Sequence, residues 1–243
     1  MRISRFYLPQ RLSPGASVRL EEESAHYLRT VLRLKPGAEL VVFNGEGGEY
    51  PATLIAAGKG DVRVVLGKHR PREAESALQI HFGLGISRGE RMDLAIQKAV
   101  ELGVSSITPL FTERCVVQFD DEARKHQRLR HWRKIAQSAC EQCGRNRVPD
   151  IAEPNTLQGW VARQGGLRLF LDPGGTMTLH KLTHTLGPVC LLSGPEGGFT
   201  GDERSVATAA GFIALRLGPR VLRTETAALA ALAAIQGLWG DMG

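Results

Sequence analysis

Residues 189–203, VCLLSGPEGGFTGDE, contain the pattern that decides the fold. The apolar run Val189 to Leu192 is typical of a buried strand, and Gly194 to Gly198 follow it as a turn-forming loop. Thr200 and Glu203 have the spacing of a capping box, in which two side chains satisfy free backbone N–H groups at a helix start. The stretch therefore predicts a strand, a glycine-rich loop and a helix.

The same alternation extends over residues 73–243, which we predict to form one domain. Further apolar runs typical of strands lie at Ile80 to Ile86, Ile107 to Phe111, Leu167 to Leu171 and Phe212 to Leu217. Helical spacing of apolar residues predicts helices at Arg91 to Leu102, capped by Gly103, at Asp121 to Cys143, and from Thr224 to Gly237. This order predicts an α/β fold with a mostly parallel sheet and helices on both faces.

Residues 1–72 have a different pattern and should form a small antiparallel barrel or sheet. Strand-like runs at Glu39 to Phe43, Glu49 to Ile55 and Val62 to Leu66 are separated by the turn signals Asn44-Gly45, Gly47-Gly48 and Gly58-Lys-Gly-Asp61. A short helix with His26, Tyr27, Arg29 and Arg33 should precede them. The polar stretch Pro71 to Ser76 reads as the linker between the two domains.

Charge and composition indicate which kind of molecule the protein binds. The net charge is +6, and Arg124 to Arg147 contain eight Lys or Arg against one acidic residue. Clustered positive charge favours an anionic partner such as nucleic acid, although a solvated helix face can show the same pattern. With no long apolar window and no secretory signal at the start, the sequence predicts a soluble cytoplasmic protein with no membrane partner.

No residue set in the sequence defines a metal site. Four cysteines fit a reducing compartment and free thiols. Cys140 and Cys143 lie on the apolar stripe of the helix from 121 to 143, so core packing explains them better than zinc or redox chemistry. His180 and His184 have a metal-compatible spacing without a third ligand, so surface placement is expected.

Three late strands each end in a loop rich in glycine and proline. The loops are Leu169 to Gly175, Leu191 to Gly198 and Leu215 to Thr224. Because ligands of open α/β sheets bind at the carboxyl ends of strands, we expect these loops to form one pocket. Gly83 and Gly85 lack the third glycine of a dinucleotide fingerprint, and no lysine completes a phosphate-binding loop. S-adenosylmethionine (SAM) is a ligand that such a pocket can hold through backbone contacts.

The same loops resemble those of a known family. Ser193-Gly-Pro-Glu-Gly-Gly-Phe-Thr200 and Leu217-Gly-Pro-Arg-Val-Leu-Arg-Thr-Glu-Thr-Ala227 resemble the cofactor loops of SPOUT methyltransferases, and within them those of the RsmE family. The likeness extends along the chain through Arg5-Phe6, residues 26–33 (HYLRTVLR), residues 90–103 and residues 136–146. RsmE enzymes are uracil-N3 methyltransferases of 16S rRNA.

This resemblance implies a fold, a reaction and partners that composition alone does not indicate. The implied fold is a deep trefoil knot behind a PUA-like β-barrel domain, in a homodimer. The implied reaction is SAM-dependent methylation of N3 of one uridine, uracil 1498, in 16S rRNA or the small ribosomal subunit. The implied cofactor-binding residues are Leu171, Asp172, Gly194, Pro195, Glu196, Gly197, Gly198, Leu217, Gly218, Val221, Leu222, Arg223, Thr224, Thr226 and Ala227.

Catalytic and RNA-binding candidates complete the predictions. Arg223 and Glu225 lie in the last cofactor loop, and Arg5 could reach the site from the N-terminal domain, so these three are the catalytic candidates. Expected phosphate contacts are Arg5, Arg29, Arg33, Arg145 and Arg147. A salt bridge within the loop is the structural alternative for Arg223. Two other functions stay open, a noncatalytic RNA-binding protein and a methyltransferase acting on ribose 2′-O or on a tRNA base.

Overall fold

The computed structural model describes residues 3–58, 61–115, 121–183 and 186–243, in two compact units. The first unit comprises Met1–Glu75 together with Cys140–Val148. The second comprises Ser76–Ala139 together with Pro149–Gly243. The short segment Cys140–Val148 belongs to the N-terminal unit although it begins in the last turn of a helix whose other residues belong to the second unit. The sequence pattern did not indicate this assignment.

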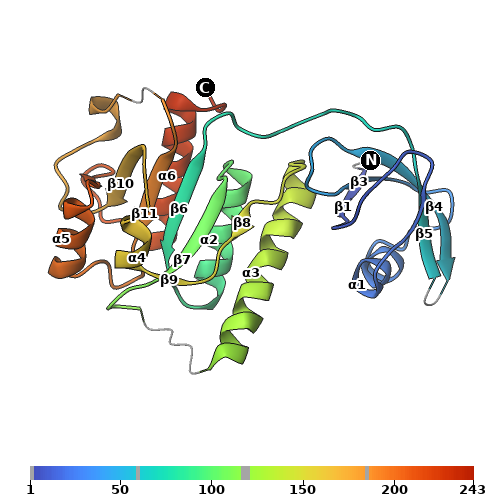
Figure 1. Ribbon diagram of the computed structural model, residues 1–243, viewed down its shortest axis with the longest axis horizontal. Coiled ribbons are helices and arrows are strands. Elements are labelled where there is room, and N and C mark those ends of the chain that lie inside the picture. The colour runs from blue at the N-terminus through green and yellow to red at the C-terminus, as the bar shows by residue number, and fades with distance from the viewer. Residues whose placement is uncertain (1–2, 59–60, 116–120, 184–185) are drawn as a thin grey trace. The chain divides into compact units, whose positions relative to one another are not determined.

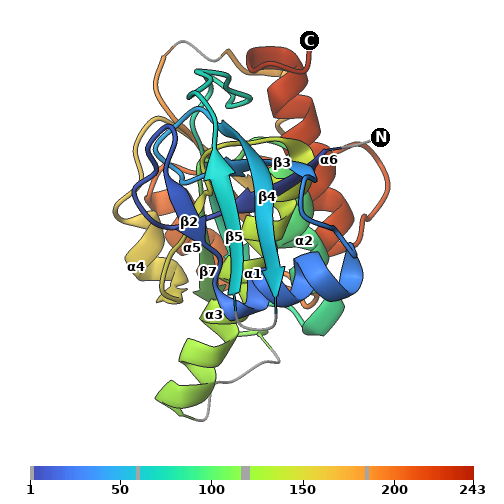
Figure 2. The same ribbon diagram turned by 90° about the vertical axis from the view of Figure 1, so that its right-hand side faces the viewer.

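The first unit is built on a five-stranded sheet with the order β1-β3-β4-β5-β2 (Figure 2). Its elements are β1 (Ser4–Tyr7), β2 (Ser17–Arg19), α1 (Glu22–His26), the π-helical turn η1 (Tyr27–Val31), β3 (Glu39–Phe43), β4 (Tyr50–Gly58) and β5 (Asp61–Leu66). The predicted strands are present, and β3, β4 and β5 pair antiparallel as expected. The sheet is mixed, however, because β1 runs parallel to β3.

Glycines make the tight turn between β3 and β4 possible. Gly45, Gly47 and Gly48 have φ values of +88°, +105° and +65°, a region that side chains with a Cβ rarely adopt. The other predicted turn, Gly58 to Asp61, contains residues 59 and 60, which lie outside the described part of the chain. One face of the sheet packs on Leu28 and Phe6, and alternate residues of β4 and β5 complete this core.

The second unit is built on a seven-stranded sheet in which every pairing is parallel (Figure 1). The order is β12-β10-β11-β6-β7-β8, and β9 also pairs with β7. The strands are β6 (Ile80–Gly85), β7 (Ser106–Phe111), β8 (Asp150–Ile151), β9 (Asn155–Thr156), β10 (Leu167–Leu171), β11 (Val189–Ser193) and β12 (Ile213–Leu215). All five residues of β11 are buried, as expected of a central strand that is covered on both faces.

Helices cover both faces of this sheet, which confirms the predicted fold class. They are α2 (Gly89–Glu101), α3 (Glu122–Cys143), α4 (Leu157–Val161), the single turn η2 (Leu179–Lys181), α5 (Gly201–Ala209) and α6 (Thr224–Trp239). Helices α4 and α5 share a core with alternate residues of β10 and β11, while α6 packs against α2 and β11. Gly103 caps α2 with a φ of +80°, as predicted.

Several predicted boundaries differ from the structure by one to three residues; β4, for example, ends at Gly58 and not at Ile55. Strand β12 ends at Leu215 and not at Leu217, and the Arg216 N–H donates to the Met177 carbonyl at 2.8 Å, outside the named strands. Helix α6 continues through Gly237 to Trp239, and Gly240 follows it. A glycine weakens a helix by about 1 kcal/mol without having to end it, so Gly237 was a poor stop signal.

The apolar stripe of α3 is confirmed by burial. Leu129, Trp132, Ala136 and Cys140 are at most 2% exposed, and Cys143 is half-buried. All four cysteines are free thiols, as predicted. Burial raises the pKa of Cys140 to about 12, although Arg145 opposes the shift. Within the described residues, no helix is both long and apolar enough to cross a membrane.

Candidate functional site

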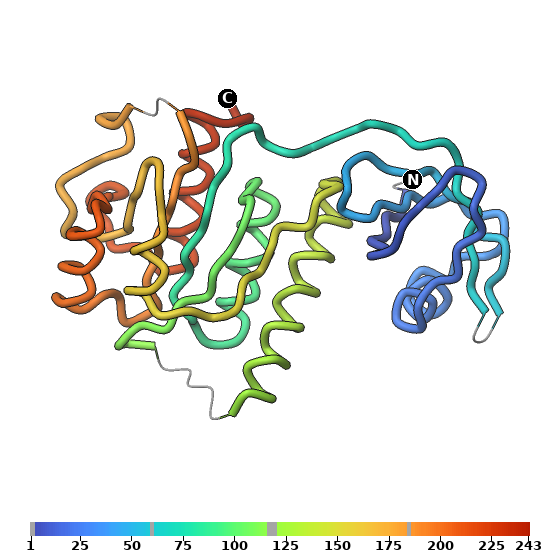
Figure 3. Tube along the Cα trace, viewed as in Figure 1, coloured from blue at the N-terminus to red at the C-terminus, as the bar shows by residue number. Residues whose placement is uncertain are grey.

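The three glycine- and proline-rich loops follow neighbouring strands and line one cavity of about 290 Å³. Strands β12, β10 and β11 are adjacent and parallel, so their carboxyl ends lie at the same edge of the sheet. The tube in Figure 3 follows this yellow-to-red part of the chain. The predicted convergence of the loops is confirmed.

Most of the predicted cofactor residues line this cavity. They are Leu171, Asp172, Gly194, Pro195, Glu196, Gly197, Gly198, Leu217, Gly218, Val221, Leu222, Thr224 and Ala227. Arg223 and Thr226 are not among the lining residues. Seven further residues line it that were not among the predicted cofactor-binding residues, namely Pro173, Ser193, Phe199, Arg204, Leu215, Arg216 and Arg220.

The loop after β11 is shaped by close backbone packing. The Gly198 N–H donates to the Pro195 carbonyl at 2.9 Å, which closes a tight turn with a Gly198 φ of +66°. A Cβ on Gly194 would lie 3.3 Å from the Phe199 ring. From β6, a Cβ on Gly85 would lie 2.5 Å from the Pro195 nitrogen, so only glycine fits there. Glycine therefore lets β6 and this loop approach each other backbone to backbone.

The start of α6 is tied to the same loop. The Thr224 hydroxyl donates to the Pro195 carbonyl at 3.0 Å. Thr224 is the first residue of α6, and the carbonyl of Arg223 accepts the first bond within the helix, from the Ala227 N–H at 2.8 Å. The hydroxyl thus joins two of the three cavity loops.

Glu196 is an ionised carboxylate on the cavity wall. Its Oε1 accepts hydrogen bonds from the Arg88 backbone N–H at 3.1 Å and from the Arg91 guanidinium at 3.2 Å. Burial alone would raise the pKa of Glu196, but hydrogen bonds from its own and the Arg88 backbone and from Arg91 lower it. Its Oε2 is buried without a hydrogen-bond partner in the described structure. Within the described structure, the Arg88 and Arg91 hydrogen bonds therefore fix the carboxylate through Oε1 and not through Oε2.

A second carboxylate, Asp172, lies at the end of β10. It pairs with Arg204 of α5 at 3.0 Å and accepts the Gly174 N–H at 2.9 Å. Its side chain is 10% exposed. Helix α5 is itself fixed by the predicted capping box, which is present with both reciprocal bonds between Thr200 and Glu203.

These walls suit a small cofactor with an apolar ring and cationic groups. Leucine side chains provide apolar lining, glycines leave backbone N–H and carbonyl groups accessible, and the carboxylates of Glu196 and Asp172 also line the cavity. A volume of about 290 Å³ is near the lower end of ligand-binding cavities. The donor set offers no phosphate cradle, and the described residues contain no cluster of three or more metal-ligating side chains. A sulfonium nucleoside such as SAM fits this set in shape and charge.

Arg223 and Glu225 lie at the helix start beside the cavity. Arg223 is exposed, and its side chain makes no hydrogen bond or ion pair with the described part of the chain. The salt bridge considered as its structural alternative is therefore not formed. Glu225 is half-buried in the first turn of α6.

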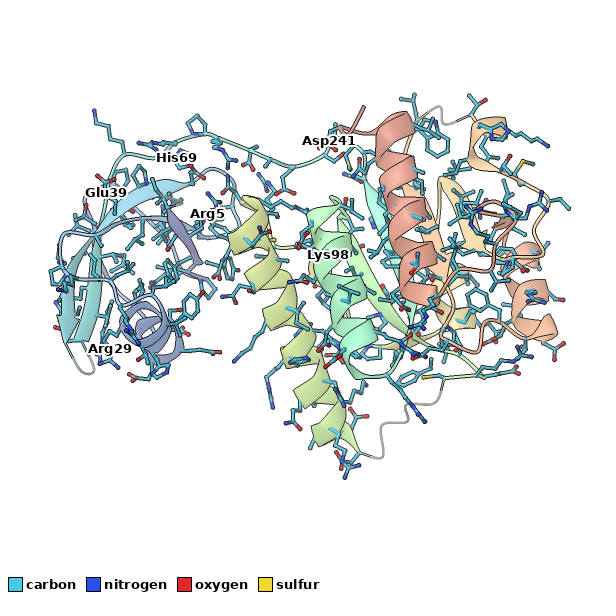
Figure 4. The ribbon with its side chains drawn as sticks, turned by 180° about the vertical axis from the view of Figure 1, so that it is seen from behind. Arg5, Arg29, Glu39, His69, Lys98 and Asp241 are labelled. Carbon is cyan, nitrogen blue, oxygen red and sulfur yellow. The ribbon has the colours of Figure 1, made fainter. Side chains whose placement is uncertain are left out.

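Arg5, which is labelled in Figure 4, and Arg145 both form salt bridges inside the first unit. The Arg5 guanidinium pairs with Glu49 and donates to the Asn146 side chain at 2.6 Å. Arg145 is 5% exposed and pairs with Glu75 at 2.6 Å. For either residue, a contact with RNA would require these bonds to break. Burial therefore favours a structural role for both, and a catalytic role for Arg5 has no geometric support.

The remaining RNA-binding candidates are more accessible. Arg33 and Arg147 are exposed, whereas Arg29 is half-buried and donates to the Gly58 carbonyl at 3.2 Å. Arg33 has a φ of +51°, and among the described residues it is the one other than glycine with a positive φ. Of the histidines considered as metal ligands, His180 is exposed as predicted, and His184 lies outside the described residues.

Comparison with known proteins gives consistent matches along the chain. Residues 74–236 match the family model of the RNA methyltransferase domain, and residues 20–67 match that of the RNA methyltransferase PUA domain. Ribosomal RNA small subunit methyltransferase E of Buchnera aphidicola subsp. Schizaphis graminum is 37% identical, with 99% of this chain and 98% of that protein covered. The Bacillus subtilis protein of the same name is 28% identical, with 93% and 92% covered.

Solved structures agree with these matches. Ribosomal RNA small subunit methyltransferase E from Neisseria gonorrhoeae, bound to SAM, superposes with a TM-score of 0.93 at 38% identity, over all of both chains. A Legionella pneumophila protein solved with bound SAM gives a TM-score of 0.96 at 40% identity, covering 99% of this chain and all of that one.

Proposed function

Because the chain belongs to the ribosomal RNA small subunit methyltransferase E family, a family of SAM-dependent enzymes, we propose that it methylates N3 of one uridine, uracil 1498, in 16S rRNA. The observation that carries the proposal is the cavity formed where β10, β11 and β12 end. Its lining is the set of loops that the sequence singled out for the cofactor.

The cofactor is held mainly by backbone and apolar groups. Leu171, Leu217 and Leu222 would give the adenine ring apolar contacts, and backbone groups of Gly194 to Gly198 would bind the polar parts of the cofactor. The carboxylates of Glu196 and Asp172 would favour the positive charge of the cofactor over a neutral analogue. Arg223 and Thr226, which were also predicted to bind it, lie next to lining residues.

Bound SAM would supply an electrophilic methyl group. The protein therefore has to align this group with the uracil base and to help N3 lose its proton. Holding both reactants in line contributes roughly 7 to 11 kcal/mol to lowering the barrier. Uridine N3 carries a proton and lies on the pairing edge, so the base must be unpaired and must lose that proton. The Arg223 guanidinium, exposed and unpaired in the described structure, stabilises the uracil anion as it forms. Glu225, in the first turn of α6, stays the second catalytic candidate of this loop. We assign no general base.

Three structural features accompany this function in our proposal. The segment leading into α6 passes through the preceding loop as a deep trefoil knot, and the Thr224 hydrogen bond to Pro195 supports such a close crossing. Two chains form a homodimer around the active sites. The substrate is 16S rRNA or the small ribosomal subunit, which places the enzyme in the cytoplasm, with Arg29, Arg33 and Arg147 as phosphate contacts.

Calorimetric titration with SAM, followed by methyl transfer to unmodified small-subunit rRNA, tests the proposal. Wild-type protein should bind SAM, and Gly194→Leu should lose binding because its side chain meets the Phe199 ring. Gly165→Leu is the matched control, since a Cβ there meets no atom within 4 Å. RNA binding without SAM binding would instead support a noncatalytic RNA-binding protein. Methyl transfer to ribose 2′-O or to tRNA would show that the acceptor is not uridine N3 of 16S rRNA.

A further inference from the structure

Two arginines on the cavity rim have no hydrogen-bond or ion-pair partner among the described residues. Arg216 and Arg220 both line the cavity and are exposed, and neither makes a side-chain hydrogen bond or ion pair with the described residues. Two other arginines differ in this respect. Arg204, which also lines the cavity, is paired with Asp172, and Arg91, which is not a lining residue, is paired with Glu196. Each cavity carboxylate thus has an arginine partner, whereas Arg216 and Arg220 have no carboxylate partner among the described residues.

This leaves an excess of positive charge on one loop. Between Leu215 and Thr224 the sequence contains three arginines and no acidic residue. Together with Arg223, the two rim arginines place three unpaired guanidinium groups within eight residues. A guanidinium is planar and always charged, and it binds phosphate through two parallel hydrogen bonds.

The loop that carries these arginines is fixed at both ends. At its start, the Arg216 N–H donates to the Met177 carbonyl at 2.8 Å. At its end, the Thr224 hydroxyl donates to the Pro195 carbonyl at 3.0 Å. Between them, Gly218 with a φ of +79° and the ring of Pro219 shape the turn. A fixed loop loses less entropy when it binds, so the arginines are preorganised.

We propose that Arg216 and Arg220 bind phosphate groups of the RNA strand on either side of the acceptor nucleotide. This inference rests on the proposed function, because the acceptor base must reach the methyl group in the cavity that both residues line. The RNA contact surface then includes the catalytic unit itself, in addition to the arginines of the N-terminal unit. A strand held at the rim presents its unpaired base to the cavity.

Binding of unmodified small-subunit rRNA at several salt concentrations tests the proposal. Each phosphate contact to a single strand contributes about 0.7 to the slope of log affinity against log salt. Arg216→Gln with Arg220→Gln should therefore lower the slope by about 1.4. Wild-type affinity should fall roughly sevenfold more than that of the double variant between 50 and 200 mM salt. At 50 mM salt the double variant should bind this RNA more weakly than the wild type.

Controls separate this role from others. Arg216→Lys with Arg220→Lys keeps the charge and should keep the slope. Arg163→Gln removes an exposed arginine that precedes β10, at the opposite edge of the sheet, and should behave as wild type. Thermal unfolding shows whether each variant is folded, so that any change in the Kd for SAM reports on the cavity itself.

Three outcomes are decisive. A lowered salt slope with an unchanged Kd for SAM supports the proposal. An unchanged slope in the double glutamine variant overturns it. A Kd for SAM that weakens in parallel would also overturn it, because the arginines would then hold the cofactor's carboxylate. The salt dependence of RNA affinity is measured without methyl transfer. If the wild type transferred no methyl group, the proposed function would be contradicted, but the salt slopes could still be compared.

Discussion

Replacing Gly85 with alanine should displace the cavity loop although no lining residue is itself replaced. The added Cβ would lie 2.5 Å from the Pro195 nitrogen and 2.7 Å from the Gly194 carbonyl carbon. Ordinary contacts begin near 3.4 Å, so the two backbones must separate by about 0.9 Å. Gly85 ends a buried central strand, and therefore the loop after β11 is the part that moves.

This displacement should lower both the free energy of unfolding and the affinity for SAM. Overpacking a buried contact lowers the free energy of unfolding by about 1 to 3 kcal/mol. A loop shifted by a large fraction of an ångström misaligns the backbone groups that we propose to hold SAM. If about 1.4 to 2.7 kcal/mol of the binding free energy is lost, the Kd for SAM rises roughly tenfold to a hundredfold.

Calorimetric titration with SAM and urea unfolding measure the two effects separately. Gly237→Ala is the control, because its Cβ meets no atom within 4 Å and it lies in α6. That variant should gain up to about 1 kcal/mol of stability from helix propensity and keep the wild-type Kd. If Gly85→Ala binds SAM as tightly as the wild type, the loop after β11 does not hold the cofactor in the way described.

Other variants and conditions test the surrounding framework. Glu203→Gln should lower the free energy of unfolding by about 1 to 3 kcal/mol in urea, because the buried carboxylate accepts two backbone N–H groups; an unchanged midpoint would contradict this. Glu49→Gln should cost about 3 kcal/mol, since it leaves a buried guanidinium unpaired in the first unit; retained thermal stability would argue against that pairing. Burial raises the pKa of Cys140 and Cys190 to about 12 and about 11, so neither should be alkylated at pH 8 until the protein unfolds, as mass spectrometry of labelled peptides can show. Because the pKa of Glu196 is lowered in the folded state, its stabilising contribution is complete above the ordinary glutamate pKa and disappears as the pH falls through the lowered value. The Kd for SAM should therefore rise in that acidic range for the wild type, and this transition should be absent in Glu196→Gln.

The main architecture could be predicted because it depends on local patterns. Strand β11 is a continuous apolar run, and the capping box at Thr200 fixes the start of α5 within a few residues. Parallel strands bring their carboxyl ends to one edge, so the three loops that follow such strands were expected to meet, and the adjacency of β12, β10 and β11 accounts for it. Thirteen of the fifteen predicted cofactor residues line the resulting cavity.

The parts that could not be predicted depend on contacts between distant residues. Arg5 and Arg145 have the composition of RNA-binding residues, yet their partners Glu49 and Glu75 lie 44 and 70 positions away in sequence. No local pattern shows that such a pair will be buried. In contrast, Arg216 and Arg220 lie in a loop that the sequence had already singled out, but their lack of partners became visible only in the structure.

Mapping the methylated nucleotide tests the central claim most directly. Unmodified small-subunit rRNA is incubated with the wild-type protein and SAM carrying a labelled methyl group, and the RNA is then digested and analysed by mass spectrometry. We expect one labelled N3-methyluridine in 16S rRNA, and none when Gly194→Leu replaces the wild type. Label on a ribose 2′-oxygen or on another base, or no transfer by a protein that binds SAM, would contradict the assigned reaction.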